Sequence, residues 1–510
     1  METIRMLCEI ISKQKVKKID VFGPNQNNKL LVNRLYEGIV SGKIYSDDDA
    51  KAFLYGNGGS QRNLLAVKRR LEEKLINTMF FVDMNKVSQN SYNQEQIKSF
   101  LSYSVVKILK SQNKFHASAR IAEKSLVKAL HYDMINLAYQ LTMDLSQYYT
   151  ILQYNKSKSS YFMALDAKLS QAFQEEQSAR RCFIYFASYI NQNKEYDESK
   201  VPSLIKREIV ELEEKLDNNQ YYDFNYYALN ALFFKSYLLQ DISSMEKISK
   251  QAVQFFQTKR HFPDLGRFSF VQKLGFIYEQ KKDYQKAVDT YEKALSFDLT
   301  EGGTAWYNVR SHLFDANLQL RNYQSCYKFL SQAISHKSFK SLFSNYKEPW
   351  LIREAYVNFL IEAGKVDIEI MKSHQLRSFS ISRFVNDVVL FSKDKRGLNI
   401  SILIIQSLFL LLREDYDGFE RKLDSLNQYA FRYLKNDGTL RSNAFIKILQ
   451  KLPDVNYHPV RWVAHTEKLL KRMRSSESKS GFDTKEKEVM SYELIHEILL
   501  EILENQKVYA

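Results

Sequence analysis

Hydrophobic residues recur at intervals of three and four along most of the chain, which is the period of an amphipathic α-helix. Near the start, this pattern predicts three short helices at residues 30–40, 47–54 and 63–75. Ser46 precedes three aspartates, and this is a strong helix start because the hydroxyl caps free backbone N–H groups and acidic side chains favour the positive end of the helix dipole. Residues 1–86 are therefore expected to form a small three-helix unit with the outline of a helix-turn-helix.

From residue 98 to residue 474 the same pattern predicts one helix after another, and we expect these helices to pack as antiparallel pairs. The small polar and charged residues at 475–488 indicate a linker. Residues 489–510 predict an amphipathic helix, which either closes the end of the array or docks on a partner. The predicted pairs are 99–111 with 115–130, 134–150 with 155–172, 177–191 with 201–216, 222–239 with 243–258, 268–281 with 284–298, and 305–321 with 323–337.

The scarcity of helix-breaking residues supports an all-α fold. The 510 residues include 15 glycines and 6 prolines, and the stretch from Ser60 to Leu265 has no glycine and two prolines, Pro202 and Pro263. A sheet protein needs turn residues at roughly every 8 to 12 positions, whereas helix pairs can turn on Asn, Asp, Lys and Ser. A predominantly β fold is therefore excluded for this stretch.

Charge and cysteine usage narrow the class of protein further. The formal net charge of +15 permits an acidic polypeptide or a nucleic acid as partner, although the Lys and Arg residues are scattered over the predicted helix faces. Cys8, Cys182 and Cys326 lie far apart in the sequence, so they form no Cys-x-x-Cys motif for a metal or for redox chemistry. Unpaired cysteines of this kind fit a reducing cytoplasm.

The longest apolar run, residues 398–412, is too short to cross a membrane. As a helix it would rise about 22 Å, against the roughly 30 Å of a hydrocarbon core. Charged residues stand close to both of its ends. The run therefore predicts a buried helix, and we expect no membrane partner.

One segment carries a specific repeat signature. Residues 268–299 place Leu-Gly-x-x-Tyr on a first helix and Tyr-x-x-Ala-x-x-x-Tyr-x-x-Ala on a second. This arrangement resembles the tetratricopeptide repeat, in which small residues let two helices approach closely and aromatic rings fill the groove between turns. The matching residues are Leu274, Gly275, Tyr278, Tyr284, Ala287, Tyr291 and Ala294. Weaker copies of the second-helix pattern begin at Phe115, Tyr323 and Tyr416.

The resemblance implies a right-handed α-solenoid of stacked antiparallel helix pairs, with the small N-terminal helical unit attached to it. It also implies that a protein or peptide partner binds in the groove along the first helices, so that the chain acts as a non-catalytic scaffold. In family members that grip a C-terminal carboxylate, Lys and Asn stand at set points of this groove. The corresponding points here are Gln272, Phe276, Ser311 and Asp315, so that clamp is not present in these copies.

A basic cluster on the third predicted helix supports an alternative function, that of a DNA-binding regulator with the repeat array as its sensor. The cluster comprises Arg62, Lys68, Arg69 and Arg70, which in a recognition helix would reach phosphates and base edges. The plainer alternative is a solvated basic face, since residues 1–86 carry 15 basic and 10 acidic residues, a modest excess. A second basic patch, from Lys468 to Arg474, is expected to complement the acidic last helix.

The sequence gives little support for an enzyme. The glycine-rich tract at 56–59 lacks the lysine and the preceding strand of a phosphate-binding loop. There is no His-Glu-x-x-His motif, and His458 and His465 have no third metal ligand near them in the sequence. We therefore expect no catalytic residues, no metal and no cofactor. An enzyme whose site forms only in space ranks behind the scaffold and the DNA-binding regulator.

Overall fold

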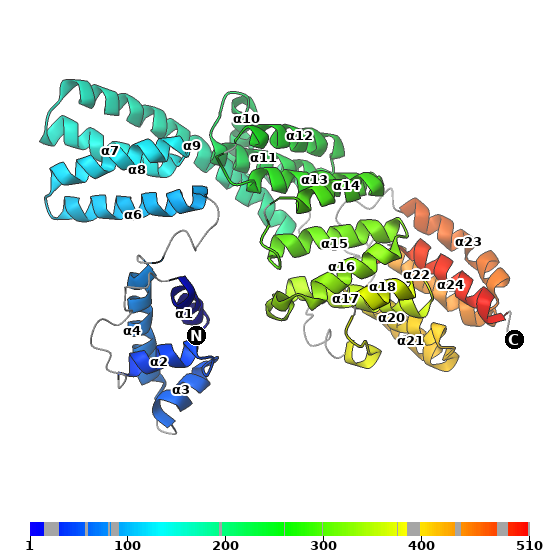
Figure 1. The fold of residues 1–510 in the computed structure, drawn as a ribbon. Helices are drawn as coiled ribbons and strands as arrows, with labels where there is room; N and C mark the ends of the chain where they lie inside the picture. Colours follow the sequence, from blue (N-terminus) through cyan, green and yellow to red (C-terminus); the bar gives the residue numbers. More distant parts are fainter. Residues whose placement is uncertain are drawn as a thin grey trace. The chain divides into compact units, whose positions relative to one another are not determined.

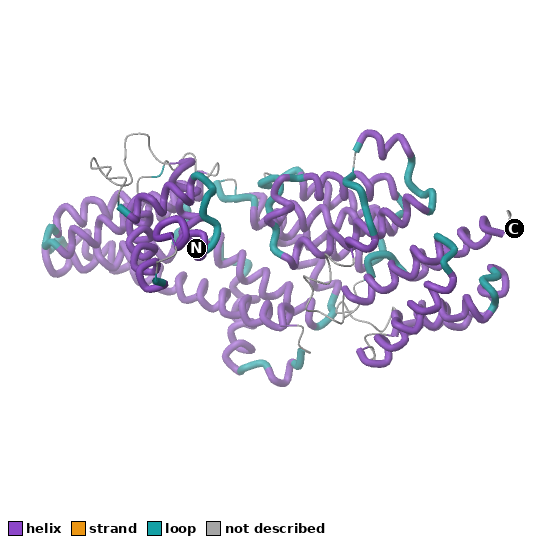
Figure 2. The backbone as a smooth tube through the Cα atoms, turned by 90° about the horizontal axis from the view of Figure 1, so that it is seen from below, coloured by secondary structure: helices purple, strands orange, loops and turns teal. Residues whose placement is uncertain are grey.

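The computed structural model describes residues 1–14, 30–56, 60–79, 82, 91–192, 196–259, 261–297, 299–374, 376–384, 398–433, 440–476 and 488–507. These residues form helices joined by short turns, and no β-strand occurs among them (Figure 1, Figure 2). The expected all-α class is confirmed. The chain divides into two compact units, Met1–Gln177 with Arg260–Pro263 and Ser178–Lys259 with Asp264–Ala510.

The first unit begins with four helices, which are α1 (Glu2–Gln14), α2 (Leu31–Val40), α3 (Asp47–Tyr55) and α4 (Gln61–Met79). The sequence pattern predicts the last three and misses α1, so the expectation of a three-helix unit is wrong. α1 is held by a short apolar stripe, because Ile4, Cys8 and Ile11 are all buried. α1, α2 and α3 all pack on α4, whose Leu64 and Leu71 are fully buried in the shared core.

The rest of the first unit is a run of helices in which each packs on the next. They are α6 (Ser91–Ser111), α7 (Phe115–His131), α8 (Ile135–Gln147), the π-helical turn η2 (Tyr148–Leu152) and the first part of α9 (Lys156–Gln192). The predicted break between a helix at 155–172 and another at 177–191 is wrong, because α9 runs through it. The four intervening residues, Phe-Gln-Glu-Glu, include no Gly or Pro and no typical capping residue that would end the helix.

The second unit continues the sequential packing through the remaining helices, so the described chain is consistent with a helical solenoid. These helices are the end of α9, α10 (Ser203–Lys215), α11 (Tyr222–Leu238), α12 (Ile242–Thr258), α13 (Leu265–Gln280), α14 (Tyr284–Leu295), α15 (Thr304–Gln319), α16 (Tyr323–Ser335), α17 (Ser344–Glu362), α18 (Ile368–Ser373), α20 (Leu398–Leu412), α21 (Tyr416–Tyr433), α22 (Leu440–Asp454), α23 (Pro459–Ser476) and α24 (Tyr492–Lys507). Two 3₁₀ turns, η3 (Glu198–Lys200) and η4 (Lys337–Ser341), lie between them.

Four of the turns inside helix pairs follow one scheme that needs no glycine. Gln240, Lys282, Arg321 and Glu414 each end a helix with φ between 59° and 60°, in the left-handed region. The next residue in each case is Asp or Asn, and its side chain accepts a hydrogen bond from the backbone N–H three residues on. A residue in the left-handed backbone conformation, followed by an N-cap residue, therefore replaces the usual glycine turn. The hydrogen bond of the N-cap offsets the conformational energy that positive φ costs a residue other than glycine.

The last helix, α24, packs on helices of its own unit. Its apolar stripe, which includes Ile495 and Leu499, is buried in the core that the helices from α15 onward share. Tyr492 stacks on Phe445 of α22, with ring centroids 4.5 Å apart. The apolar stripe is therefore covered by the chain itself. The predicted linker at 475–488 lies mostly outside the described residues, and its first two residues belong to α23.

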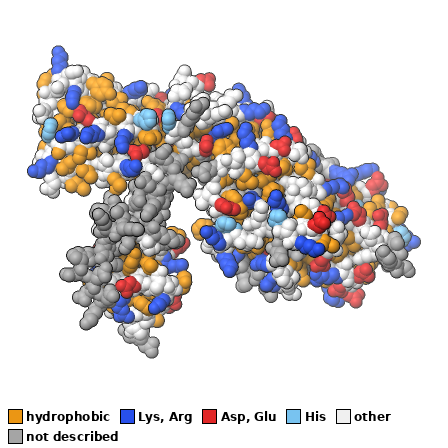
Figure 3. All heavy atoms as spheres, viewed as in Figure 1, with side chains coloured by type: hydrophobic (Ala, Val, Ile, Leu, Met, Phe, Trp, Pro, Cys, Tyr) orange, Lys and Arg blue, Asp and Glu red, His pale blue; other side chains and the backbone are white. Residues whose placement is uncertain are grey.

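The apolar run at 398–412 forms α20, whose Ile404, Ile405 and Leu408 have no exposed surface. The expected buried helix is confirmed. None of the described helices combines the length and the apolar character needed to span a bilayer. On the face that Figure 3 shows, Lys and Arg side chains are interspersed with acidic and apolar ones and form no single continuous patch.

Candidate interaction surfaces

The pair α13 and α14 is packed around a glycine. A Cβ atom added to Gly275 would collide with the ring of Tyr291, so the close approach of the two helices at this point requires glycine. The other residues of the signature are placed as follows: Tyr278, Ala287 and Ala294 are buried in the same apolar cluster, and Leu274 and Tyr284 are half-buried.

The predicted groove residues lie on α13 and α15, and all four are half-buried. The Phe276 ring contacts that of Tyr237 on α11, with centroids 5.9 Å apart. Asp315 accepts two hydrogen bonds from the guanidinium of Arg353 on α17, at 2.9 and 2.5 Å. Asp315 is therefore engaged within the chain, whereas Gln272 and Ser311 have no hydrogen bond to another described side chain.

A partly buried polar cluster joins the α13–α14 pair to α15, and the sequence gives no sign of it. Nδ1 of His312 lies 3.5 Å from a carboxylate oxygen of Glu279, and the His312 ring stacks on Tyr291 at 5.0 Å. Burial disfavours the imidazolium, but Glu279 and Asp315 outweigh it and raise the pKa of His312. Burial raises the pKa of the Tyr291 hydroxyl. The cluster couples successive helix pairs electrostatically.

Lys273 on α13 lies among aromatic rings of α11 and of its own helix. Its ammonium is 4.8 Å from the ring centroid of Phe270 and 5.2 and 5.6 Å from those of Phe233 and Phe234, and it donates to the Ser269 hydroxyl at 2.8 Å. Burial lowers the pKa of Lys273 to about 7. The ring faces stabilise the cation in part. This lysine therefore changes charge near neutral pH.

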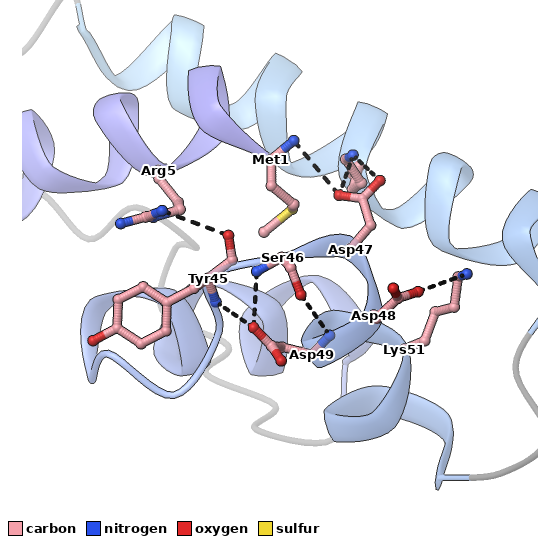
Figure 4. Close-up of polar contacts among 9 residues, drawn as sticks. Met1, Arg5, Tyr45, Ser46, Asp47, Asp48, Asp49 and Lys51 are labelled. Atoms are coloured by element: carbon pink, nitrogen blue, oxygen red, sulfur yellow. Dashed lines mark hydrogen bonds and ion pairs between the residues drawn. The ribbon is translucent and has the colours of Figure 1, made fainter. Parts of the chain in front are cut away.

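The N-terminal unit positions its basic helix through an acidic helix start. The Ser46 hydroxyl accepts from the Asp49 N–H, and the Asp49 carboxylate accepts from the N–H groups of Ser46 and Tyr45 (Figure 4). The Asp47 carboxylate faces Nζ of Lys68, 2.9 Å away, and this hydrogen bond is the main reason that the pKa of Asp47 is lowered. The predicted helix start at Ser46 is confirmed as a capping box.

The structure separates the four predicted nucleic-acid-binding residues into two groups. Lys68 is half-buried and faces α3, where Asp47 holds it. Arg62, Arg69 and Arg70 lie on the exposed face of α4, opposite the buried leucines. Arg69 also pairs with Glu73 one turn on, at 3.1 Å. Three of the four residues are therefore accessible to a ligand.

The expected pairing of the basic patch on α23 with the acidic last helix does not occur among the described residues. Glu497 of α24 pairs with Arg321 at 2.5 Å, and Glu501 pairs with Lys365. Within α23, Lys471 pairs with Glu467. The pairs that hold α24 join side chains up to 176 positions apart, and helical spacing carries no signal for such contacts.

No group of three His, Cys, Asp or Glu side chains that could hold a metal ion occurs in the described part of the chain. His458 precedes α23 and His465 lies exposed on it. Comparison with protein-family models, with curated proteins and with solved structures gave no match to the chain.

Proposed function

We propose that the chain is a non-catalytic scaffold, built as a right-handed array of tetratricopeptide-like helix pairs that binds a partner polypeptide along its first helices. The observation that carries this proposal is the direct contact between successive first helices. Tyr237 of α11 contacts Phe276 of α13, Glu279 of α13 contacts His312 of α15, and Asp315 of α15 contacts Arg353 of α17. First helices that touch in this way present one continuous face.

The composition of this face supports a peptide ligand. Gln272, Phe276 and Ser311 are half-buried, so amide, aromatic and hydroxyl groups lie within reach of an extended segment. A polypeptide bound there would exchange hydrogen bonds with these groups and bury part of the aromatic surface. The shared turn of a left-handed residue followed by Asp or Asn supports the same proposal, because it recurs in four helix pairs.

Site-specific photocrosslinking tests the scaffold proposal. A photoreactive phenylalanine at Gln272 or Ser311 is expected to form covalent adducts with a partner polypeptide in native lysate. The matched control carries the same residue at Gln285 or Lys293, which are exposed on the second helix of a pair. Adducts formed equally at all four positions, or at none, would contradict binding along the first helices.

A second candidate function is sequence-reading or backbone binding of DNA by α4. The exposed positions of Arg62, Arg69 and Arg70 on one face of a 19-residue helix favour it. If these three residues contact phosphates, replacing all three with Ala should lower the slope of log affinity against log salt by about 3. The control replaces Lys286, Lys293 and Lys328, which are exposed elsewhere, and changes the net charge equally. No salt-sensitive binding of duplex DNA at about 50 mM salt would exclude this function.

A further inference from the structure

The side chain of Lys273 on α13 ends among aromatic rings. Its ammonium lies 4.8 Å from the ring centroid of Phe270 on the same helix, and 5.2 and 5.6 Å from those of Phe233 and Phe234 on α11. The Phe270 and Phe233 side chains are buried, whereas Lys273 and Phe234 keep part of their surface exposed. The lysine is therefore held between rings of two helices and remains partly accessible.

No acidic side chain in the described part of the chain forms an ion pair with Lys273. The ammonium donates a hydrogen bond to the Ser269 hydroxyl one turn earlier, at 2.8 Å, and this hydroxyl is uncharged. The acidic residues of the helices α11 to α15 do not pair with the lysine, and they are Asp223, Glu246, Glu279, Asp289, Glu292 and Asp315. The positive charge is therefore opposed by burial and compensated by no anion.

These surroundings favour the neutral amine, which is the form of lysine that attacks an electrophile. Burial lowers the pKa of Lys273 to about 7, so about half of the amine is neutral at this pH. A lysine of ordinary pKa, about 10.4, is neutral in roughly one molecule in 2,500 at pH 7. Lys273 is therefore far richer in the reactive form than an exposed lysine of the same chain.

We propose that Lys273 is a site of acylation, at which the amine takes an acyl group from an acyl thioester. The amine nitrogen attacks the thioester carbonyl carbon, an N–C bond forms as the C–S bond breaks, and the proton that the nitrogen loses ends on the departing thiolate. The product is a neutral amide, so no charge has to be desolvated among the rings, and the Ser269 hydroxyl remains as a hydrogen-bond partner for it. This proposal concerns one side chain and does not depend on partner binding along the first helices.

The test incubates the full chain with acetyl-CoA, as the thioester probe, and measures the rate of acetylation at each lysine by peptide mass spectrometry. Lys293 and Lys328 are exposed on second helices and serve as internal controls in the same sample. Two substitutions at one position separate charge from packing. Ser269→Asp places a carboxylate one turn before Lys273, where it can form an ion pair, and Ser269→Ala removes the hydroxyl without adding charge.

At pH 7, Lys273 is expected to be acetylated about 10-fold or more faster than Lys293 and Lys328. Its rate should level off above about pH 8, whereas the rates at the two control lysines should keep rising toward about pH 10. Ser269→Asp should slow acetylation of Lys273 at pH 7 by about 10-fold, and Ser269→Ala should leave it within about 3-fold of wild type. The proposal is overturned if Lys273 of the wild type reacts no faster than the control lysines, if its rate rises in parallel with theirs, or if the two substitutions have equal effects.

Discussion

Gly275 shows how one neighbouring ring can restrict the choice of a residue. Replacing it with Ala places a methyl group against Tyr291, so we expect Gly275→Ala to lower the free energy of unfolding by about 1–3 kcal/mol, as overpacking does in well-filled cores. Chemical denaturation measures this change. Gln280→Ala, at the exposed end of the same helix, should change stability by no more than about 0.5 kcal/mol. Equal effects of the two substitutions would contradict the close approach at Gly275.

The lowered pKa of Lys273 predicts that the free energy of unfolding rises with pH above neutrality. Because its pKa is about 7 in the folded chain and 10.5 in the reference state, the unfolded chain holds a proton in this window that the folded chain has lost. The free energy of unfolding should therefore increase from pH 7 toward pH 10.5 through this residue. Urea denaturation at several pH values compares wild type with Lys273→Met, in which this increase should be absent. Parallel curves for the two proteins would show that Lys273 does not titrate in this range.

At the scale of residues, the sequence predicts contacts within one repeat better than contacts between repeats. Gly275 and Tyr291 are 16 positions apart in a known pattern, so their packing is readable from spacing. The contact of Glu279 with His312 and that of Asp315 with Arg353 depend on how two helix pairs stack, and a local pattern holds no information on this. The sequence therefore does not reveal that Asp315, a predicted groove residue, binds the guanidinium of Arg353.

Arg441 is the main polar anchor of α24. It is 8% exposed, and its guanidinium binds the carboxylates of both Glu488 and Glu493 and donates to the Met473 carbonyl. We expect Arg441→Leu to lower the free energy of unfolding by about 3–5 kcal/mol, because two largely buried carboxylates, 16% and 18% exposed, lose their cation. The same unfolding assay on Arg461→Leu, at an exposed site on α23, should detect little change. Adding Glu488→Gln and Glu493→Gln to Arg441→Leu should restore part of the loss, and failure to restore any would argue against the charge mechanism.

The lowered pKa of His496 predicts that the packing of α24 on α23 weakens in acid. Its ring stacks on Trp462 at 4.2 Å, and burial lowers its pKa to about 4 from 6.5. As the pH falls from 6.5 toward 4, the unfolded chain takes up a proton that the folded chain does not, so the free energy of unfolding falls by about 2 kcal/mol. Hydrogen exchange of α24 at pH 6.5 and pH 4.5 measures the change, with His496→Phe as the comparison. An equally large loss of protection in the variant would rule out His496 as its cause.

At the scale of elements, the existence of helices is predictable and their ends are less so. Apolar spacing locates most of the helices between residues 30 and 337, because burial of one face requires it, but it gives no bounds for α1, α17, α22 and α23. The end of a helix depends on single residues, so α9 continues where no cap or breaker stops it. The left-handed turns at Lys282 and Arg321 are equally hard to foresee, because long charged residues are not the usual choice for positive φ.

At the scale of the molecule, separate hydrophobic cores predict separate responses to truncation. The helices from α15 to α24 share one core, whereas α1 to α4 enclose another. A chain that ends at residue 488 should therefore lose amide protection in α20, α22 and α23 while α4 keeps its protection, as measured by hydrogen exchange with mass spectrometry. The control ends at residue 507 and should match the full chain. Uniform loss of protection, including α4, would show that the two cores are not independent.

The place of α24 after the other helices of its core has a consequence for synthesis on the ribosome. Arg321 emerges 176 residues before Glu497, its partner. At roughly 5–20 residues per second, the nascent chain spends about 9–35 s with this partner and the covering apolar stripe still untranslated. During that interval the growing array exposes the surface that α24 later buries. Chaperone demand should therefore be high while the residues between Arg321 and Glu497 are translated, and it should fall once α24 leaves the exit tunnel.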